Sequence, residues 1–341
     1  MKPSVLLIYT GGTIGMVEDT RTRSLKPFDF SQITDHIPEL QSFNISLSSV
    51  SFEEPIDSSN MNPVIWVRLA RLIEKNYKRF DGFVILHGSD TMAFTASALS
   101  FMLENLSKPV VLTGSQLPMG IIRTDGKENL ITAIEIASRK VKGKAVVPEV
   151  CIYFEYQLYR GNRTHKFNAE QFQAFRSANY PVLAEAGVSI KFTRNAAHKV
   201  SGSGRKLKVH TRLNTAISVL KLYPGITENA VAAILNTKGI RALVLETFGS
   251  GNASTDKWFL DLLEKAISKG ILIYNVTQCN AGRVVQGKYD TSAKLKKLGV
   301  VSGVDITFEA AVAKLMFVLG QGGSGKDMRR MLERPLRGEM S

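Results

Sequence analysis

Cysteine is scarce in this chain, and long apolar runs are absent. Its 341 residues include two cysteines, Cys151 and Cys279, so a disulfide framework is not expected and a reducing compartment fits. No segment approaches the roughly 20 apolar residues that a membrane-spanning helix needs. The apolar run VLLIY at 5–9 ends at a glycine-rich segment, and its five residues are too few for the apolar region of a signal peptide. We therefore expect a cytoplasmic protein that does not interact with membranes.

Histidine and acidic residues are also few. The five histidines lack the spacing of metal ligands, so no metal and no other cofactor is expected. Lys and Arg number 44 against 30 Asp and Glu, and the formal net charge of +14 raises the question of nucleic-acid binding. The basic residues are spread along the chain, with concentrations at 191–212 and 326–337, and no aromatic-interleaved basic stripe accompanies them. The sequence therefore does not favour a nucleic-acid partner, and it leaves the cause of the charge open.

Alternating apolar strands and amphipathic helices predict an α/β fold with two domains. The length exceeds one typical domain, and 44% hydrophobic residues suffice for packed cores. The chain then divides into an N-terminal domain at 1–190 with a mostly parallel sheet and flanking helices, a Gly-, Ser-, Lys- and Arg-rich linker at 191–214, and a smaller C-terminal α/β domain at 215–341. Strands are expected near residues 5, 82, 110, 150, 216–220, 242–245 and 271–275, and helices near 64–78, 91–105, 127–139, 228–235 and 257–268.

The first predicted strand ends in the loop TGGTIG at 10–15. Its paired glycines allow a ligand to approach the backbone, and Thr13 would be presented to that ligand. The loop lacks the G-x-G-x-x-G spacing of dinucleotide-binding proteins, and no lysine follows until Lys26, as a P-loop would need, so phosphate binding is disfavoured. Thr13 is therefore a candidate nucleophile or substrate clamp, with a glycine-rich turn without chemistry as the alternative.

Two further predicted strands also end in hydroxyl-bearing turns. The run GFVIL at 82–86 precedes HGSDTM at 87–92, and VVL at 110–112 precedes TGSQ at 113–116. In open parallel sheets, ligands bind beyond the carboxyl ends of the strands. We therefore expect these turns to converge on one crevice with the loop of Thr13.

Five segments in order carry a family resemblance. They are YTGGTIGM at 9–16, DSS at 57–59, HGSDTM at 87–92, TGSQ at 113–116 and YRGNRTHK at 159–166. With these segments the chain resembles the asparaginases over nearly its whole length. The later segments FGSGNA at 248–253 and NVTQCNAG at 275–282 are similar to the type I, cytoplasmic branch.

The resemblance implies an amidohydrolase that converts L-asparagine and water to L-aspartate and ammonia. Thr13 would attack the side-chain amide carbon and form an acyl-enzyme, and Asp90 and Lys166 would support a second hydroxyl. In the family that hydroxyl belongs to a threonine, whereas this chain has Ser89, which keeps the O–H group with a freer χ1. A lysine accepts a proton only as a neutral amine, so the sequence leaves open which group is the general base.

Recognition of an α-amino acid needs partners for its carboxylate and its ammonium group. Ser58 and Ser59 are candidates for the carboxylate, Asp57 and Asp90 for the ammonium group, with Ser89 beside them. Asp57 and its neighbours also read as a helix cap, because Asn62-Pro63 predicts a helix start, and both interpretations can hold. The preference for asparagine over glutamine is not fixed by the sequence.

Three features depart from the family pattern. Residues 17–29, which look like a lid loop, contain no tyrosine, although many family members carry one there. Some type I enzymes have an allosteric asparagine site with an arginine where this chain has Glu246 and a threonine where it has His165, while Cys279 is kept. A carboxylate at position 246 would repel the carboxylate of the effector, so we predict that this site is absent or altered.

The resemblance also implies a homodimer or homotetramer in which a neighbouring subunit completes the active site. Asn252 is the candidate for that contribution, and a turn residue is the equal alternative. A tRNA-dependent amidotransferase subunit shares the core but carries an extra N-terminal domain, whereas here the first motif begins at Tyr9. A non-catalytic asparagine sensor would need a broken site, yet Thr13, Asp90 and Lys166 are present.

Overall fold

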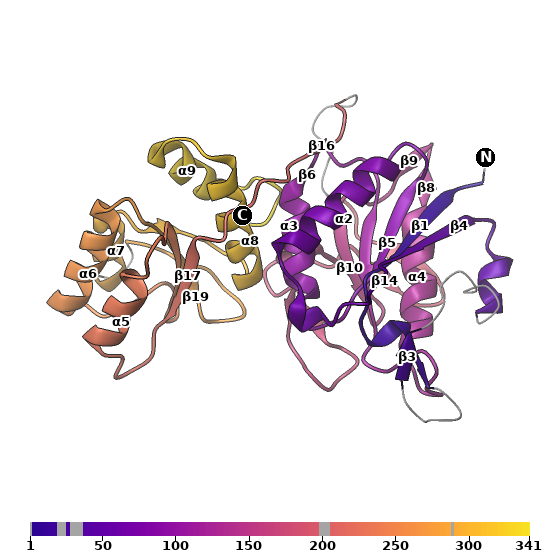
Figure 1. Ribbon diagram of the computed structural model, residues 1–341, viewed down its shortest axis with the longest axis horizontal. Helices are drawn as coiled ribbons and strands as arrows, with labels where there is room; N and C mark the ends of the chain where they lie inside the picture. Colours follow the sequence, from indigo (N-terminus) through magenta and orange to yellow (C-terminus); the bar gives the residue numbers. More distant parts are fainter. Residues whose placement is uncertain (1, 19–24, 28–36, 198–204, 288–289) are drawn as a thin grey trace. The chain divides into compact units, whose positions relative to one another are not determined.

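The computed structural model describes residues 2–18, 25–27, 37–197, 205–287 and 290–341. The chain divides into two compact units, Met1–Thr211 and Arg212–Ser341, both shown in Figure 1. No helix in these described ranges is both long and apolar enough to cross a membrane.

The first unit is built on an eight-stranded sheet. Its spatial order is β15-β14-β11-β10-β7-β5-β1-β4, and the five strands from β10 to β4 are parallel, while β11, β14 and β15 pair antiparallel. The strands span β1 (Ser4–Tyr9), β4 (Ser46–Ser51), β5 (Gly82–Leu86), β7 (Val110–Thr113), β10 (Val150–Phe154), β11 (Gln157–Arg160), β14 (Ala184–Ala186) and β15 (Ile190–Phe192).

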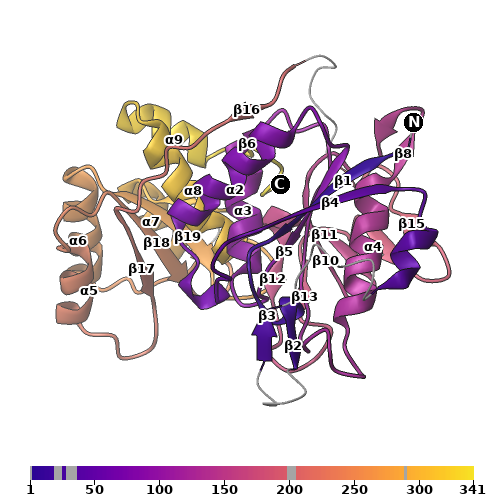
Figure 2. The same ribbon diagram turned by 45° about the vertical axis from the view of Figure 1, so that its right-hand side comes forward.

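Both faces of the central strands are buried, which explains their continuous apolar sequence. Successive side chains of a strand point to opposite faces. Val5 and Leu7 of β1 share a core with helix α4 (Gly126–Ser138), whereas Phe83 of β5 faces the other side and stacks on Tyr77 at 6.1 Å between ring centroids. Figures 1 and 2 show α2 (Pro63–Asn76) and α3 (Met92–Met102) on that second face and α4 on the first. The layers leave the strand ends as the place for polar loops.

Short elements connect these layers. Helix α2 starts where Asn62-Pro63 predicts, because the Asn62 side chain accepts hydrogen bonds from the backbone N–H groups of Val64 and Ile65. The smaller elements are β2 (Met16–Glu18), β3 (Leu25–Pro27), β6 (Leu103–Glu104), β8 (Lys140–Val141), β9 (Lys144–Ala145), β12 (His165–Lys166), β13 (Phe175–Arg176), β16 (Lys208–Val209) and the 3-10 helices η1 (Thr13–Gly15), η3 (Pro38–Ser42), η4 (Ser58–Asn60) and η5 (Gly161–Arg163).

The second unit contains a parallel four-stranded sheet in the order β17-β18-β19-β20. These strands span β17 (Ile217–Lys221), β18 (Ala242–Thr247), β19 (Leu272–Thr277) and β20 (Val301–Ser302), and the helices span α5 (Glu228–Leu235), α6 (Lys257–Ser268), α7 (Asp290–Leu298), α8 (Phe308–Gln321) and α9 (Gly325–Leu332). Lys314 of α8 forms a fully buried ion pair with Glu339, at 2.7 Å between Nζ and Oε1, and so fastens the C-terminal segment to this unit.

The predicted fold class, two α/β domains with a mostly parallel sheet in the first, is confirmed. One helix boundary is corrected. The helix predicted near 91–105 ends at Met102, because Leu103 and Glu104 pair antiparallel with Val209 and Lys208 and Asn105 takes a positive φ of 61°. Strand β16 thus lies in the segment for which we predict a linker, and it is hydrogen-bonded to the first unit.

Candidate active site

Three hydroxyl-bearing loops follow β1, β5 and β7 at the same edge of the sheet. Thr10 donates two hydrogen bonds to the carbonyl oxygen of Leu86, from its backbone N–H at 3.1 Å and from its hydroxyl at 2.8 Å. The backbone N–H of His87 donates to the carbonyl oxygen of Thr113 at 2.9 Å. The loops are therefore joined edge to edge by hydrogen bonds, as the parallel order of their strands requires.

Glycine is required where these loops touch. Gly12 has a φ of 88°, and a Cβ atom added to it would lie 2.4 Å from the backbone nitrogen of Gly88. A Cβ atom on Gly88 would lie 2.6 Å from the hydroxyl oxygen of Ser58. Real Cβ contacts are not this short, so any side chain at either position would push the loops apart. The segments of Thr13 and Ser89 are thus packed backbone against backbone, and the side chain of Ser58 packs on Gly88.

Thr13 is the first residue of η1 and is partly exposed. Among the residues that the structure describes, no side chain or backbone group hydrogen-bonds its hydroxyl. The neighbouring Ile14 is fully buried in the core beside α4, and the backbone N–H of Gly15 donates to the carbonyl oxygen of Gly12 at 3.1 Å. The backbone on both sides of Thr13 is therefore fixed while its hydroxyl is left for another partner.

Ser89, Asp90 and Lys166 come together although 76 residues separate Asp90 from Lys166. The Lys166 ammonium donates to the Ser89 hydroxyl at 2.9 Å and to Oδ1 of Asp90 at 2.5 Å. The Lys166 side chain is 16% exposed and that of Asp90 is 62% exposed. Lys166 lies in the short hairpin of β12 and β13, and from there its amine reaches the HGSD turn. This cluster joins a hydroxyl, an amine and a carboxylate, which are the groups that proton transfer to and from a nucleophile needs.

Gln116 is a neighbour of this cluster, and no role was predicted for it. The Ser89 hydroxyl donates to Oε1 of Gln116 at 3.2 Å. Nε2 of Gln116 donates to the carbonyl oxygens of Ala169 and Gln171, each at 3.1 Å. The TGSQ motif was the only sequence signal for this residue, because Ala169 and Gln171 lie 53 and 55 residues further along the chain.

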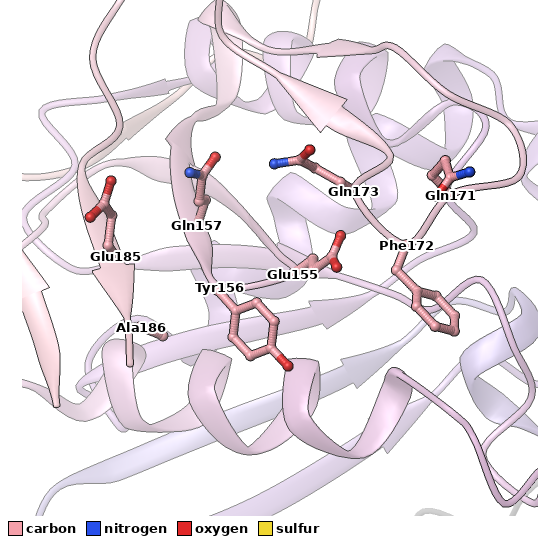
Figure 3. A pocket seen from close by; sticks show the side chains of 8 residues that line it. All are labelled: Glu155, Tyr156, Gln157, Gln171, Phe172, Gln173, Glu185 and Ala186. Atoms are coloured by element: carbon pink, nitrogen blue, oxygen red, sulfur yellow. The ribbon is translucent and has the colours of Figure 1, made fainter. Parts of the chain in front are cut away.

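A cavity of about 540 Å³ has Gln171 in its lining. It is lined by residues 155–157, 171–173, 185 and 186, whose side chains are drawn in Figure 3. Burial raises the pKa of Glu155 in its wall, and the nearby carboxylates of Asp125 and Glu128 raise it further. This cavity holds none of the predicted site residues.

His87 anchors the turn that carries Ser89, and sequence reasoning missed it. Its Nδ1 lies 2.7 Å from the carbonyl oxygen of Gly88, which only accepts hydrogen bonds, so Nδ1 carries the proton. Nε2 then accepts from the Thr95 hydroxyl at 2.8 Å, and Thr95 accepts from the indole N–H of Trp66 at 3.0 Å. Burial lowers the pKa of His87 to about 4, so the ring is neutral at pH 7. A buried histidine after a strand gave no signal that separated it from an ordinary core residue.

The DSS segment performs the structural role that its sequence allows. Asp57 caps η4 by accepting a hydrogen bond from the backbone N–H of Ser59 at 2.8 Å, and this bond lowers the pKa of its carboxyl group. Ser58 is buried, and its carbonyl oxygen accepts from the Thr91 hydroxyl at 2.7 Å. Ser59 is exposed. The segment is therefore tied to the HGSD turn through Ser58.

In the second unit, Asn252 accepts a hydrogen bond from the Thr291 hydroxyl at 2.9 Å. Asn252 closes a turn with Phe248, in which Gly249 and Gly251 take positive φ angles, and both roles predicted for Asn252 stay predictions. Glu246 of β18 has its carboxylate 3.8 Å from Nζ of Lys221, and burial raises its pKa. His165 lies in β12, opposite Arg176.

Two further predictions concern the lid loop and the lack of a metal site. Most of the predicted lid loop at 17–29 lies outside the described residues. Within the described ranges, no group of three or more His, Cys, Asp or Glu residues has the arrangement of a metal site.

Comparisons with known proteins match the whole chain. Residues 4–198 match the family model "Asparaginase, N-terminal", and residues 216–332 match "Glutaminase/Asparaginase C-terminal domain". The chain is 41% identical to L-asparaginase 1 of Escherichia coli, over 100% of this chain and 98% of that protein. It is also 41% identical to a 60 kDa lysophospholipase of Mus musculus, over 99% of this chain and 62% of that protein. The crystal structure of L-asparaginase I from Vibrio cholerae superposes with a TM-score of 0.90 at 38% identity and covers 100% of both chains. With both family models and these full-length relatives, the chain belongs to the asparaginase family.

Proposed function

We propose that this protein hydrolyses L-asparagine to L-aspartate and ammonia through an acyl-enzyme on Thr13. The Thr13 hydroxyl oxygen adds to the side-chain amide carbon, the C–N bond breaks, and ammonia leaves with the proton that the hydroxyl gave up. Water then adds to the ester carbon, aspartate is released, and Thr13 regains its proton. The full-length similarity to L-asparaginase 1 of Escherichia coli supports this substrate.

One observation carries the assignment of the site. The Ser89, Asp90 and Lys166 cluster belongs to a turn whose Gly88 packs directly on Gly12, the residue before Thr13. The Thr13 hydroxyl thus lies on a loop that contacts the turn of Ser89 and Asp90, and the Lys166 amine binds both of these residues. In the proposed reaction, Asp90 orients Lys166, and Ser89 relays protons between Lys166 and the attacking groups.

The substrate groups remote from the amide need partners of their own. We assign the α-carboxylate to the hydroxyl groups of Ser58 and Ser59 and to the backbone N–H of Ser58, because the N–H of Ser59 donates to Asp57, and we assign the α-ammonium group to Asp90 with Asp57 beside it. The exposed carboxylate of Asp90 supports this second role, because its Oδ1 alone is bonded to Lys166. Asp57 uses Oδ1 for its cap, which leaves its other oxygen for a ligand.

The proposed enzyme is a cytoplasmic homo-oligomer that needs no cofactor. Two free cysteines, Cys151 and Cys279, fit a reducing compartment. We propose that Asn252 contributes to the active site of a neighbouring subunit, and that the chain forms a dimer or a tetramer. We further propose that the domains divide at the predicted linker, 191–214.

The decisive experiment measures ammonia release from asparagine and from glutamine across a range of substrate concentrations. Thr13→Ala should lower kcat for asparagine by at least about 10³-fold, because the nucleophile is gone, whereas Thr13→Ser keeps a hydroxyl and should retain measurable turnover. Circular dichroism of each variant controls for folding.

Undiminished turnover by folded Thr13→Ala would contradict the proposed nucleophile. If the folded wild type releases ammonia from neither amide, the tRNA-dependent amidotransferase and the asparagine sensor become the better explanations. Filter binding to tRNA over a salt series would then separate these two, because phosphate contacts weaken as salt rises.

A further inference from the structure

Gln116 contacts three segments of the proposed site and has no part in the proposed chemistry. Its carbonyl oxygen meets the Ser89 hydroxyl, and its amide nitrogen meets the loop that follows Lys166. Its own backbone is held in turn, since its N–H lies 3.0 and 3.1 Å from the two carboxylate oxygens of Asp125. The carboxylate of Asp125 also accepts from the backbone N–H of Leu117, so the start of α4 fixes this segment.

The direction of the Gln116 amide follows from its partners. The backbone oxygens of Ala169 and Gln171 accept hydrogen bonds and cannot donate them, so the group that faces both must be the NH₂ group. The carbonyl oxygen is thereby turned toward Ser89. It can only accept, which makes Ser89 the donor in that contact.

This fixes the single proton of Ser89. Lys166 donates to the Ser89 oxygen, so the hydroxyl proton is the one that Ser89 gives to Gln116. The oxygen keeps one more lone pair for the reacting groups. We infer that Gln116 is a positioning residue, which holds Ser89 in one rotamer and holds the loop after Lys166 against it.

The chain has a specific need for such a residue. A threonine is restricted at χ1 by its methyl group, whereas a serine rotates among three wells. Ser89 lacks that internal restriction, and its hydrogen bonds with Lys166 and Gln116 replace it. The inference rests on the proposed mechanism, because the rotamer of Ser89 matters only if its hydroxyl takes part in the reaction.

The test replaces the amide with an apolar side chain of similar length. Gln116→Met should lower kcat for asparagine by about 2- to 10-fold, which is the effect of losing one net hydrogen bond, with KM changed by less than about twofold. Gln173→Met is the matched control, because Gln173 is exposed on the cavity of Figure 3 and, within the described part of the chain, hydrogen-bonds no member of the cluster. It should leave kcat unchanged.

Rescue separates positioning from a general loss of structure. Ser89→Thr should raise kcat in the Gln116→Met background by more than it changes kcat in the wild type, because the added methyl restores the restriction at χ1. An equal effect of Ser89→Thr in both backgrounds overturns the inference, as does unchanged kcat in Gln116→Met.

Ser89→Ala separates the positioning role of Gln116 from the proposed mechanism. If Ser89→Ala lowers kcat and Gln116→Met does not, only the positioning role of Gln116 is wrong. If Ser89→Ala leaves kcat unchanged, the proposed mechanism is wrong and the inference falls with it.

Discussion

Acidification should destabilise this protein through His87 in a way that can be isolated. The ring is fully buried, and burial lowers its pKa from 6.5 to about 4. In the unfolded chain the ring takes up a proton near its ordinary pKa, whereas in the folded chain it stays neutral down to pH 4. The unfolded state therefore binds more protons between these values, and the stability falls as the pH falls through this window.

The magnitude follows from the width of the window. The fall of the pKa from 6.5 to about 4 corresponds to about 3 kcal/mol of stability, all of it lost below pH 4. At pH 5 the loss should be about 2 kcal/mol, and above pH 6.5 it should vanish. The hydrogen bonds explain why the neutral ring is held, since Thr95 must donate to Nε2 for the chain from Trp66 to be satisfied.

The assay compares the wild type with His87→Gln, which offers an amide donor and acceptor but does not titrate. Urea unfolding at a fixed protein concentration is followed by the fluorescence of Trp66 in a Trp258→Phe background, because the chain has two tryptophans. Between pH 7.5 and pH 5, the free energy of unfolding should fall by about 2 kcal/mol more in the wild type than in the variant. Carboxyl groups titrate in both proteins and cancel in this difference. Parallel pH dependences would refute the reasoning.

Two further predictions concern the second unit. Lys314→Met strands the buried carboxylate of Glu339 and should lower the stability by about 3–5 kcal/mol in urea unfolding, whereas Lys314→Met combined with Glu339→Gln should recover part of that loss, because no charge is left buried. A single variant as stable as the wild type would contradict this. Asparagine hydrolysis should follow a hyperbolic curve with a Hill coefficient near one, because Glu246 would repel the carboxylate of an allosteric effector. Clear sigmoidicity would disprove an absent or altered allosteric site.

The parts of the fold that the sequence predicts well are those with a single strong pattern. Helices α5 and α6 begin and end at the predicted residues, since Thr227 caps the first by accepting from Ala230 N–H and the apolar positions of both recur at helical spacing. Strand β4 has the sequence SLSSVS and escaped prediction because an exposed edge strand carries few apolar residues. Helix α8 escaped as well, because it is apolar on most sides and has weak periodicity.

The residues of the site also divide into those that could be predicted from the sequence and those that could not. Resemblance put Ser89 and Lys166 in one site, and the structure places them 2.9 Å apart, but their chemical roles stay predictions. Gln116 and His87 lay inside segments that the sequence singled out, yet nothing local distinguished them. Their roles depend on Ala169 and Trp66, which reach them only through the packing of other elements.

The contact between Gly12 and Gly88 limits how this active site can change over evolution. Where side chains set the spacing of two loops, a larger or smaller residue adjusts that spacing by small steps. Here main-chain atoms, which every residue shares, set the spacing of the proposed nucleophile and the proposed proton relay, so substitution at the contact offers no intermediate step. Variation in activity should therefore accumulate around the contact and not in it. The serine at position 89 is one such variation, and Gln116 beside it is the next place to look for a compensating one.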